Sequence, residues 1–224
     1  WLTTGLKTLE FENKFKKYKK SKYALALNSC TAALHLSLKL LNLNKNDEVI
    51  TSALTFSSTI NSIIMSGAKP VLVDVNLETQ NIDPSQIEKK INKNTKAILI
   101  VHFAGRPCEM REILKITKKY KLFLIEDCAH AIESKYNNKH LGTFGTFGCF
   151  SFYATKNLSI GEGGMLLTDS KKLYDKARPL HHLLPGYSQK KYFQTNKIGR
   201  ARGWGYHMLW AISLAYMYKS FNEY

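Results

Sequence analysis

Apolar residues along the chain form short continuous runs that alternate with segments of helical spacing. The runs at 23–28, 49–53, 70–75, 97–103 and 122–127 have the length and apolar content of buried strands. Helical spacing predicts helices over 29–41, through 60–65, from a capping Asp83-Pro84 pair to 91, and over 109–120. Strands that alternate with helices predict an α/β fold with a mostly parallel, doubly wound sheet.

The pattern changes after residue 127. Two closely spaced strands are expected at 145–153 and 164–169, followed by a helix over 170–177. Residues 179–202 are polar, basic and aromatic, which predicts a long loop, and 203–224 return to helical spacing. We therefore divide the chain into an N-terminal segment and helix (1–22), a large domain (23–178), and a basic loop with a terminal helix (179–224).

The chain is strongly basic, with a net charge of +16 over 224 residues. A basic surface attracts polyanions, and one dense lysine cluster lies at 14–22. In that cluster Phe11, Phe15 and Tyr18 share one helical stripe and the lysines share the other face. Because no nucleic-acid-binding motif accompanies it, we interpret the cluster as a solvated amphipathic helix and expect no nucleic-acid partner.

Membrane and redox signals both favour a cytoplasmic protein. No stretch approaches the roughly 20 apolar residues of a membrane-spanning helix, and the first residues lack a signal-peptide pattern. The apolar run 208–218 is better interpreted as a core or interface helix. The four cysteines have no paired spacing, so we expect reduced thiols rather than disulfides; they are Cys30, Cys108, Cys128 and Cys149.

Candidate chemistry gathers at predicted strand ends. Lys156 lies between an apolar strand and a glycine-rich turn, which makes it a candidate reactive amine rather than a surface lysine. Asp127 ends a buried strand, where open α/β sheets place their ligands. Ser29 and Thr31 begin a helix and are either simple N-caps or part of a phosphate site. With the aromatic Phe56 after the next strand, these are the parts of a site for pyridoxal 5'-phosphate (PLP).

Six motifs occur in order along the chain and together resemble the DegT/DnrJ/EryC1/StrS family of sugar aminotransferases. They are Leu2-Thr-Thr-Gly5, Asn28-Ser-Cys-Thr-Ala-Ala-Leu-His35, Thr55-Phe-Ser-Ser-Thr59, His102-Phe-Ala-Gly-Arg-Pro107, Glu126-Asp-Cys-Ala-His130, and Ser151-Phe-Tyr-Ala-Thr-Lys-Asn157 with Gly161-Glu-Gly-Gly164. The resemblance covers nearly the whole chain, and its specificity comes from the co-occurrence of the motifs.

The resemblance implies the large domain of a fold-type I aminotransferase, with the small C-terminal domain missing. It implies that Lys156 carries PLP covalently and acts as the proton-transferring base, and that Asp127 pairs with the pyridinium nitrogen. It also implies an amino donor, usually glutamate, a keto-sugar nucleotide as acceptor, and a homodimer. The remaining site residues follow from the motifs: His130 near the ring, Phe56 on the ring face, and Ser29, Thr31 and Ser151 around the phosphate.

The chain departs from the family pattern at several positions. Cys30 replaces a small residue, Arg106 replaces a glutamine, and Gly205 stands where a partner asparagine reaches the phosphate. The sequence also stops where the small domain is expected to begin. An alternative is therefore a truncated or divergent member that binds PLP or partners without full turnover. The basic segment from His181 to Arg202 is either a solvated loop or a source of counter-charge for the substrate diphosphate.

Other chemistries have weaker support. Family dehydratases replace the cofactor lysine with histidine, so Lys156 argues against them. No nucleophile elbow surrounds Ser151, which disfavours a hydrolase built on Ser151, His130 and Asp127. The glycines of 142–148 lack dinucleotide-binding spacing. A zinc site is disfavoured because its candidate ligands lack recognised spacing; they are His102, Cys108, Cys128 and His130.

Overall fold

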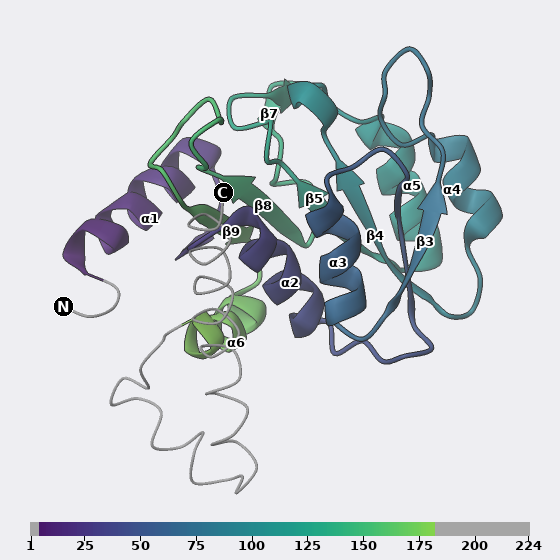
Figure 1. The fold of residues 1–224 in the computed structure, drawn as a ribbon, viewed down its shortest axis with the longest axis horizontal. Coiled ribbons are helices and arrows are strands. Elements are labelled where there is room, and N and C mark those ends of the chain that lie inside the picture. Colours follow the sequence, from purple (N-terminus) through teal and green to yellow (C-terminus); the bar gives the residue numbers. More distant parts are fainter. Residues whose placement is uncertain (1–4, 182–224) are drawn as a thin grey trace, which may run out of the picture. The chain divides into compact units, whose positions relative to one another are not determined.

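The computed structural model of the chain describes residues 5–181. Residues 5–177 form one compact unit built around a seven-stranded sheet (Figure 1). Its strands are β1 (Tyr23–Leu27), β2 (Glu48–Ser52), β3 (Lys69–Val73), β4 (Thr95–Val101), β5 (Phe123–Asp127), β8 (Phe147–Ser151) and β9 (Gly164–Thr168). The helices are α1 (Leu6–Lys19), α2 (Cys30–Leu40), α3 (Ser57–Met65), α4 (Pro84–Lys90), α5 (Met110–Tyr120) and α6 (Lys171–His181).

The strand order of the sheet is β1-β9-β8-β5-β4-β2-β3. Every pair from β8 to β3 is parallel, and β9 runs antiparallel to both of its neighbours. The carboxyl ends of β1, β2, β4, β5 and β8 therefore meet at one edge. Gly164, the first residue of β9, pairs there with Leu27 and Ser151. The predicted mostly parallel α/β sheet is confirmed.

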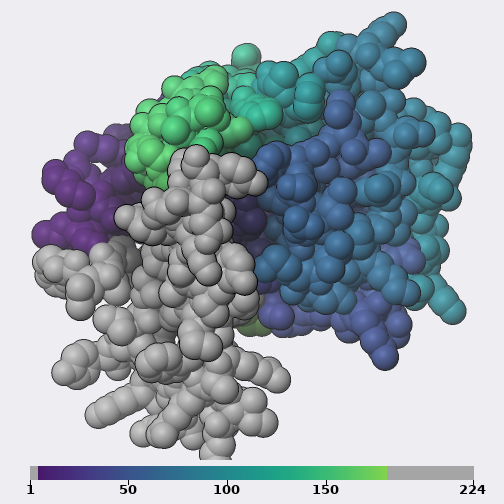
Figure 2. Space-filling model, in the orientation of Figure 1, coloured from purple at the N-terminus to yellow at the C-terminus, as the bar shows by residue number. Residues whose placement is uncertain are grey.

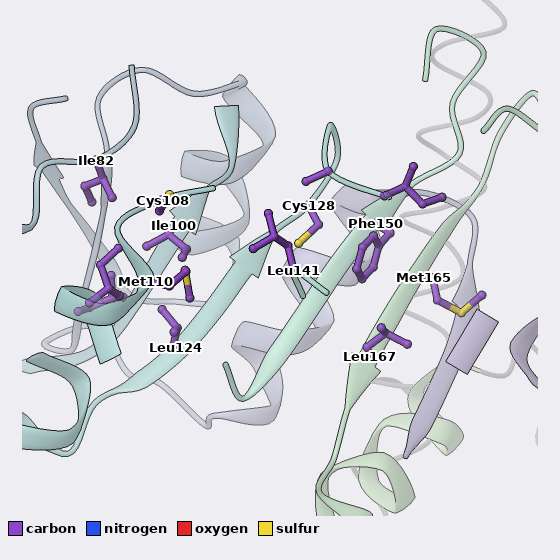
Figure 3. Close-up of a cluster of buried hydrophobic side chains, with 14 of the residues drawn as sticks. Ile82, Ile100, Cys108, Met110, Leu124, Cys128, Leu141, Phe150, Met165 and Leu167 are labelled. Carbon is purple, nitrogen blue, oxygen red and sulfur yellow. The ribbon is translucent and has the colours of Figure 1, made fainter. Parts of the chain in front are cut away.

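Helices cover both faces of the sheet, as the contacts on the two sides of β8 show. Phe150 contacts the Phe15 ring of α1 at 5.2 Å between centroids. The adjacent Cys149 lies beside Ser37 of α2. Since successive side chains of a strand point to opposite faces, α1 and α2 cover opposite faces. Figure 3 shows part of the larger core cluster that lines the sheet, including Phe150, Leu167 and Leu124.

Helix α1 confirms Phe11 and Phe15 of the predicted aromatic stripe as core contacts, whereas Tyr18 is 48% exposed beside His140. It also corrects the picture of a fully solvated lysine face. Phe11 and Phe15 pack on Phe152. Lys19, however, is only 1% exposed: its Nζ donates to the Ile132 carbonyl at 3.0 Å and lies 4.5 Å from the Phe150 ring centroid. Burial lowers the pKa of Lys19 to about 8. The apolar stem of the Lys19 side chain packs in the core, and the Ile132 carbonyl and the Phe150 ring stabilise its amine there.

Two local features differ from expectation. A short hairpin of β6 (Lys135–Tyr136) and β7 (Lys139–His140) precedes β8, with Asn137 and Asn138 at positive φ in its turn. Asparagine tolerates that conformation, so the Asn-Asn pair was a usable hairpin signal. Helix α6 continues to His181 with Pro179 inside it, beyond the predicted end at residue 177.

Several predictions lie outside the described residues: the rest of the basic loop, the terminal helix and Gly205. Within residues 5–181, no helix is long and apolar enough to cross a bilayer. All four cysteines are free and buried, as expected.

Candidate functional site

The sheet brings the predicted site residues to one edge. Ser29 follows β1, and Phe56 precedes α3 after the end of β2. Asp127 and Ser151 are the last residues of β5 and β8. The segment 152–163, which carries Lys156, leaves β8 and returns to Gly164 at the same edge. Parallel strands that end together explain how residues more than a hundred positions apart converge.

Asp127 is a buried carboxylate whose donors in the described part of the chain are neutral. Its Oδ1 accepts from the Ala129 N–H at 3.0 Å and lies 3.8 Å from the Cys30 thiol, and its Oδ2 accepts from the Thr59 hydroxyl at 3.3 Å. Burial raises the pKa of Asp127, and these hydrogen bonds and two nearby histidines only partly oppose it. A cationic partner would therefore stabilise the ionised form of this group.

Ser29 acts as the N-cap of α2, since its hydroxyl accepts from the Ala32 N–H at 3.2 Å. Ser29 therefore caps the helix, while the exposed Thr31 keeps its hydroxyl at the start of the helix. Gly164 makes close approach possible: a Cβ at this position would lie 2.3 Å from the Ser29 carbonyl and 2.7 Å from the Cys30 nitrogen. The first turn of α2 remains suited to an anion, because N–H groups and the helix dipole converge there.

Backbone hydrogen bonds hold the segment that carries Lys156. The Phe152 N–H donates to Gly163 at 2.9 Å, the Ile160 N–H to Phe152 at 3.0 Å, and the Lys156 N–H to Tyr153 at 2.9 Å. Lys156 itself is half-buried. Burial is the main cause that lowers the pKa of His130, and the positive charge of Lys156 is the second. Lys156 also acts on Cys30, so the amine lies within electrostatic reach of His130 and of the thiol beside Asp127.

Phe56, His130 and Ser151 differ in how closely they are held. The Phe56 ring is 75% exposed and leaves its face available for stacking. His130 is exposed and lies edge-on to Phe103, with 6.4 Å between ring centroids. Ser151 is buried, and its hydroxyl accepts from the Tyr153 N–H at 3.4 Å. All three belong to segments at the carboxyl edge of the sheet.

Glu126 is a buried anion that sequence reasoning left without a role. It lies next to Asp127 on β5, so it faces the opposite side of the sheet. It accepts four hydrogen bonds, from the Gly142, Phe144 and Gly145 N–H groups at 2.7 Å each and from His102 Nε2 at 3.2 Å. Burial alone would raise the pKa of Glu126, but the hydrogen bonds from His102, Gly145 and Gly142 lower it overall.

This network also answers whether a metal fits here. Donor atoms of His102, Glu126 and Cys128 lie within 4.8 Å of one another. His102 Nδ1 accepts from the Cys108 N–H at 3.2 Å, so Nε2 carries the proton that it donates to Glu126. Because both Glu126 oxygens and both His102 nitrogens are already paired, we interpret the group as a structural hydrogen-bond network. His102 and Cys128 of this group are two of the four residues that the sequence analysis considered as zinc ligands.

The residues of the site together provide the chemical groups that would hold PLP. The first turn of α2 suits a phosphate, the buried Asp127 suits a protonated ring nitrogen, and the Lys156 amine suits an aldehyde. Thr59, which bonds Asp127, was part of a recognised motif but had no predicted role.

Comparison with known proteins adds to this geometry. The model of the DegT/DnrJ/EryC1/StrS aminotransferase family matches residues 1–210. The chain is 49% identical over 180 residues to the spore coat polysaccharide biosynthesis protein SpsC of Bacillus subtilis, covering 80% of this chain and 46% of that protein. It is 42% identical over 200 residues to the GDP-perosamine synthase of Escherichia coli O157:H7, covering 89% and 54%.

A solved structure agrees with the sequence relatives. The PLP-form of the putative sugar aminotransferase Spr1654 from Streptococcus pneumoniae superposes with a TM-score of 0.77 at 31% identity, covering 80% of this chain and 51% of that chain. The same protein is also known in a PMP-form. The chain thus spans about half the length of the relatives that it matches.

Proposed function

Because the chain belongs to the DegT/DnrJ/EryC1/StrS aminotransferase family, we propose that it is the large domain of a PLP-dependent sugar aminotransferase. The reaction moves an amino group from an amino acid, glutamate, to a keto-sugar nucleotide. The observation that carries the proposal is the buried Asp127 carboxylate at the same sheet edge as the Lys156 segment and the first turn of α2.

Each predicted residue takes a role that its position permits. When bound, PLP supplies an aldehyde that reacts with amines and a ring that accepts electron density. Lys156 holds the cofactor and, once released, moves a proton at the substrate carbon. Asp127 holds the ring nitrogen in its protonated form. Phe56 covers one ring face, His130 lies near the ring, and the phosphate binds at Ser29, Thr31 and Ser151.

The substrate assignment draws on the names of relatives. One relative is named for spore coat polysaccharide biosynthesis and another as a GDP-perosamine synthase. We infer from them that the acceptor is a nucleotide-linked keto-sugar and that the product enters polysaccharide synthesis. The four basic side chains Lys190, Lys191, Arg200 and Arg202 lie outside the described residues. If they bind the diphosphate, their neutralisation raises the Michaelis constant for the sugar nucleotide.

We further infer a homodimer and a cytoplasmic location. Four exposed apolar side chains lie beside the site, which supports an interface there; they are Phe56, Tyr153, Leu158 and Ile160. Figure 2 shows that part of the blue segment, which includes α3, reaches the surface of the unit. Free, buried cysteines fit a reducing compartment. Sedimentation of the purified chain with and without PLP tests the dimer: a monomer under both conditions would refute it.

A half-reaction tests the proposed function. The purified chain is incubated with PLP, and its cofactor absorption band is followed after addition of glutamate. Competent protein loses the band and releases 2-oxoglutarate, whereas Lys156→Ala does neither. A wild-type band that persists with glutamate and with other amino acids contradicts the aminotransferase assignment and points to the alternative of binding without turnover.

A further inference from the structure

Thr59 connects the Asp127 carboxylate to the turn that carries Phe56. The Thr59 side chain is fully buried, and its Oγ1 donates to Asp127 Oδ2 at 3.3 Å. The same oxygen accepts from the Thr55 hydroxyl at 2.7 Å. A hydroxyl has one proton to donate, so the bond from Thr55 leaves the Thr59 proton for Asp127. The two threonines therefore form a directed chain of hydrogen bonds that ends on the carboxylate.

The local backbone keeps this chain in place. Thr59 is the third residue of α3, and its N–H donates to the Phe56 carbonyl at 3.0 Å. Phe56 thus lies between the two threonines, and its backbone is bonded to one of them. The Thr59 bond also places Asp127 near the positive end of the α3 dipole, which favours an anion.

The second Asp127 oxygen is held differently. Oδ1 accepts from the Ala129 N–H at 3.0 Å, and the Cys30 sulfur lies at 3.8 Å. A thiol is a weak donor, so it is a poor substitute for a hydroxyl. Among the described residues, Thr59 is consequently the side chain that donates most effectively to Asp127.

We propose that Thr59 is a positioning residue that holds the Asp127 carboxylate ionised and aimed at the cofactor ring nitrogen, and couples it to the turn that carries Phe56. The inference rests on the proposed function, since it concerns the group that receives the ring. It differs from that function in naming a residue that touches neither cofactor nor substrate. Thr55 supports Thr59 from the half-buried side of the turn.

Other titratable groups near Asp127 bear on any titration of it. They come from each neighbouring element and remain unchanged in the variants below; they are Cys30 of α2, Cys149 of β8, His102 after β4, and Cys128 and His130 after β5. A change in Asp127 titration caused by substitution of Thr59 alone is therefore assigned to the missing hydroxyl.

The first test needs no cofactor. Aspartate labelled at its side-chain carboxyl carbon is followed by NMR across pH in the cofactor-free chain, and Asp127→Asn assigns the signal. Thr59→Val removes the donor at nearly constant volume, so the pKa of Asp127 should rise by about one unit. Thr59→Ser keeps the hydroxyl and should restore the wild-type value. Thr59→Ala serves if the valine variant fails to fold.

Ser62→Ala is a matched control. Ser62 is also fully buried on α3, one turn further along, and its hydroxyl has no hydrogen-bond partner among the described residues. Its replacement removes a buried hydroxyl from the same helix without touching Asp127. The pKa of Asp127 should therefore stay at the wild-type value.

The second test measures PLP affinity by fluorescence titration. The titration is run at a pH about one unit below the wild-type pKa of Asp127, where a one-unit rise in that pKa lowers the ionised fraction about tenfold. Thr59→Val should then weaken binding about tenfold, while Thr59→Ser and Ser62→Ala bind like wild type. Wild-type values of both pKa and affinity in the valine or alanine variant would overturn the inference, and so would a shifted pKa with unchanged affinity. If wild type itself does not bind PLP, the proposed function fails instead, and the pKa measurement still decides the Thr59 contact.

Discussion

Replacement of Glu126 by glutamine tests the buried network behind the site. In the wild type each carboxylate oxygen accepts two hydrogen bonds: Oε1 from Phe144 and Gly145, and Oε2 from Gly142 and His102. Glutamine has nearly the same shape but carries two N–H groups in place of one oxygen. Whichever oxygen is replaced, two donors then face a donor.

The expected destabilisation follows from the number of hydrogen bonds that are lost. A hydrogen bond to a charged acceptor contributes about 1.5–3 kcal/mol, so loss of two predicts a destabilisation of about 3–6 kcal/mol. At a urea dependence of roughly 2 kcal/mol per molar, the unfolding midpoint of the chain should fall by about 1.5–3 M. Circular dichroism during urea titration measures it. Glu112→Gln, which breaks only an exposed ion pair with Lys115, should change stability by less than about 0.5 kcal/mol.

The same experiment has a pH dependence with a defined sign. The folded-state pKa of Glu126 is depressed, so its stabilisation is present above the unfolded-state pKa and is lost as the pH falls through the folded-state value. The difference between wild type and Glu126→Gln should therefore shrink in acid. A glutamine variant within 1 kcal/mol of wild type at neutral pH would refute the assignment of these four bonds.

Three further substitutions test other parts of the account. Relative to Lys19→Met, the unfolding free energy of the wild type should rise by up to about 3 kcal/mol between pH 8 and 10.5 in urea titrations, because the unfolded chain retains the Lys19 proton over that window. The comparison with Lys19→Met removes the opposing contribution of the buried thiols, whose raised pKa values both proteins share. Gly164→Ala should weaken PLP binding more than tenfold in fluorescence titrations, since its Cβ would displace the Ser29 backbone, whereas Gly5→Ala meets open space and should have no effect. Phe56→Ala should weaken PLP binding roughly fivefold through loss of stacking and leave the urea midpoint unchanged, because the ring is exposed.

The strands of the seven-stranded sheet and the helices up to α6 were predictable because their apolar periodicity is strong, whereas the short β6–β7 hairpin was not predicted. The convergence of Asp127 and Lys156 was also accessible, since it needs only parallel strands that end at one edge. The reversal of β9 was not, because a five-residue apolar strand reads the same in either direction. The resemblance supplied the cofactor roles that residue types alone leave open.

Sequence reasoning failed where a polar group is buried by long-range packing. A lysine-rich helix gives no sign that Lys19 faces the core, because its acceptor lies more than a hundred residues away at Ile132. The role of Glu126 likewise depends on three backbone N–H groups from 142–145, which periodicity does not locate. Adjacent carboxylates at the end of a buried strand were nevertheless a signal, since one of them must face each side of the sheet.

The most direct test of the central claim is to reduce the PLP-loaded chain with borohydride and locate the cofactor by peptide mass spectrometry. Our account predicts one stoichiometric adduct, on the peptide that contains Lys156, and none on that site in Lys156→Ala. Folded wild-type protein with an unmodified Lys156 peptide, or with the adduct on a different lysine, would contradict it.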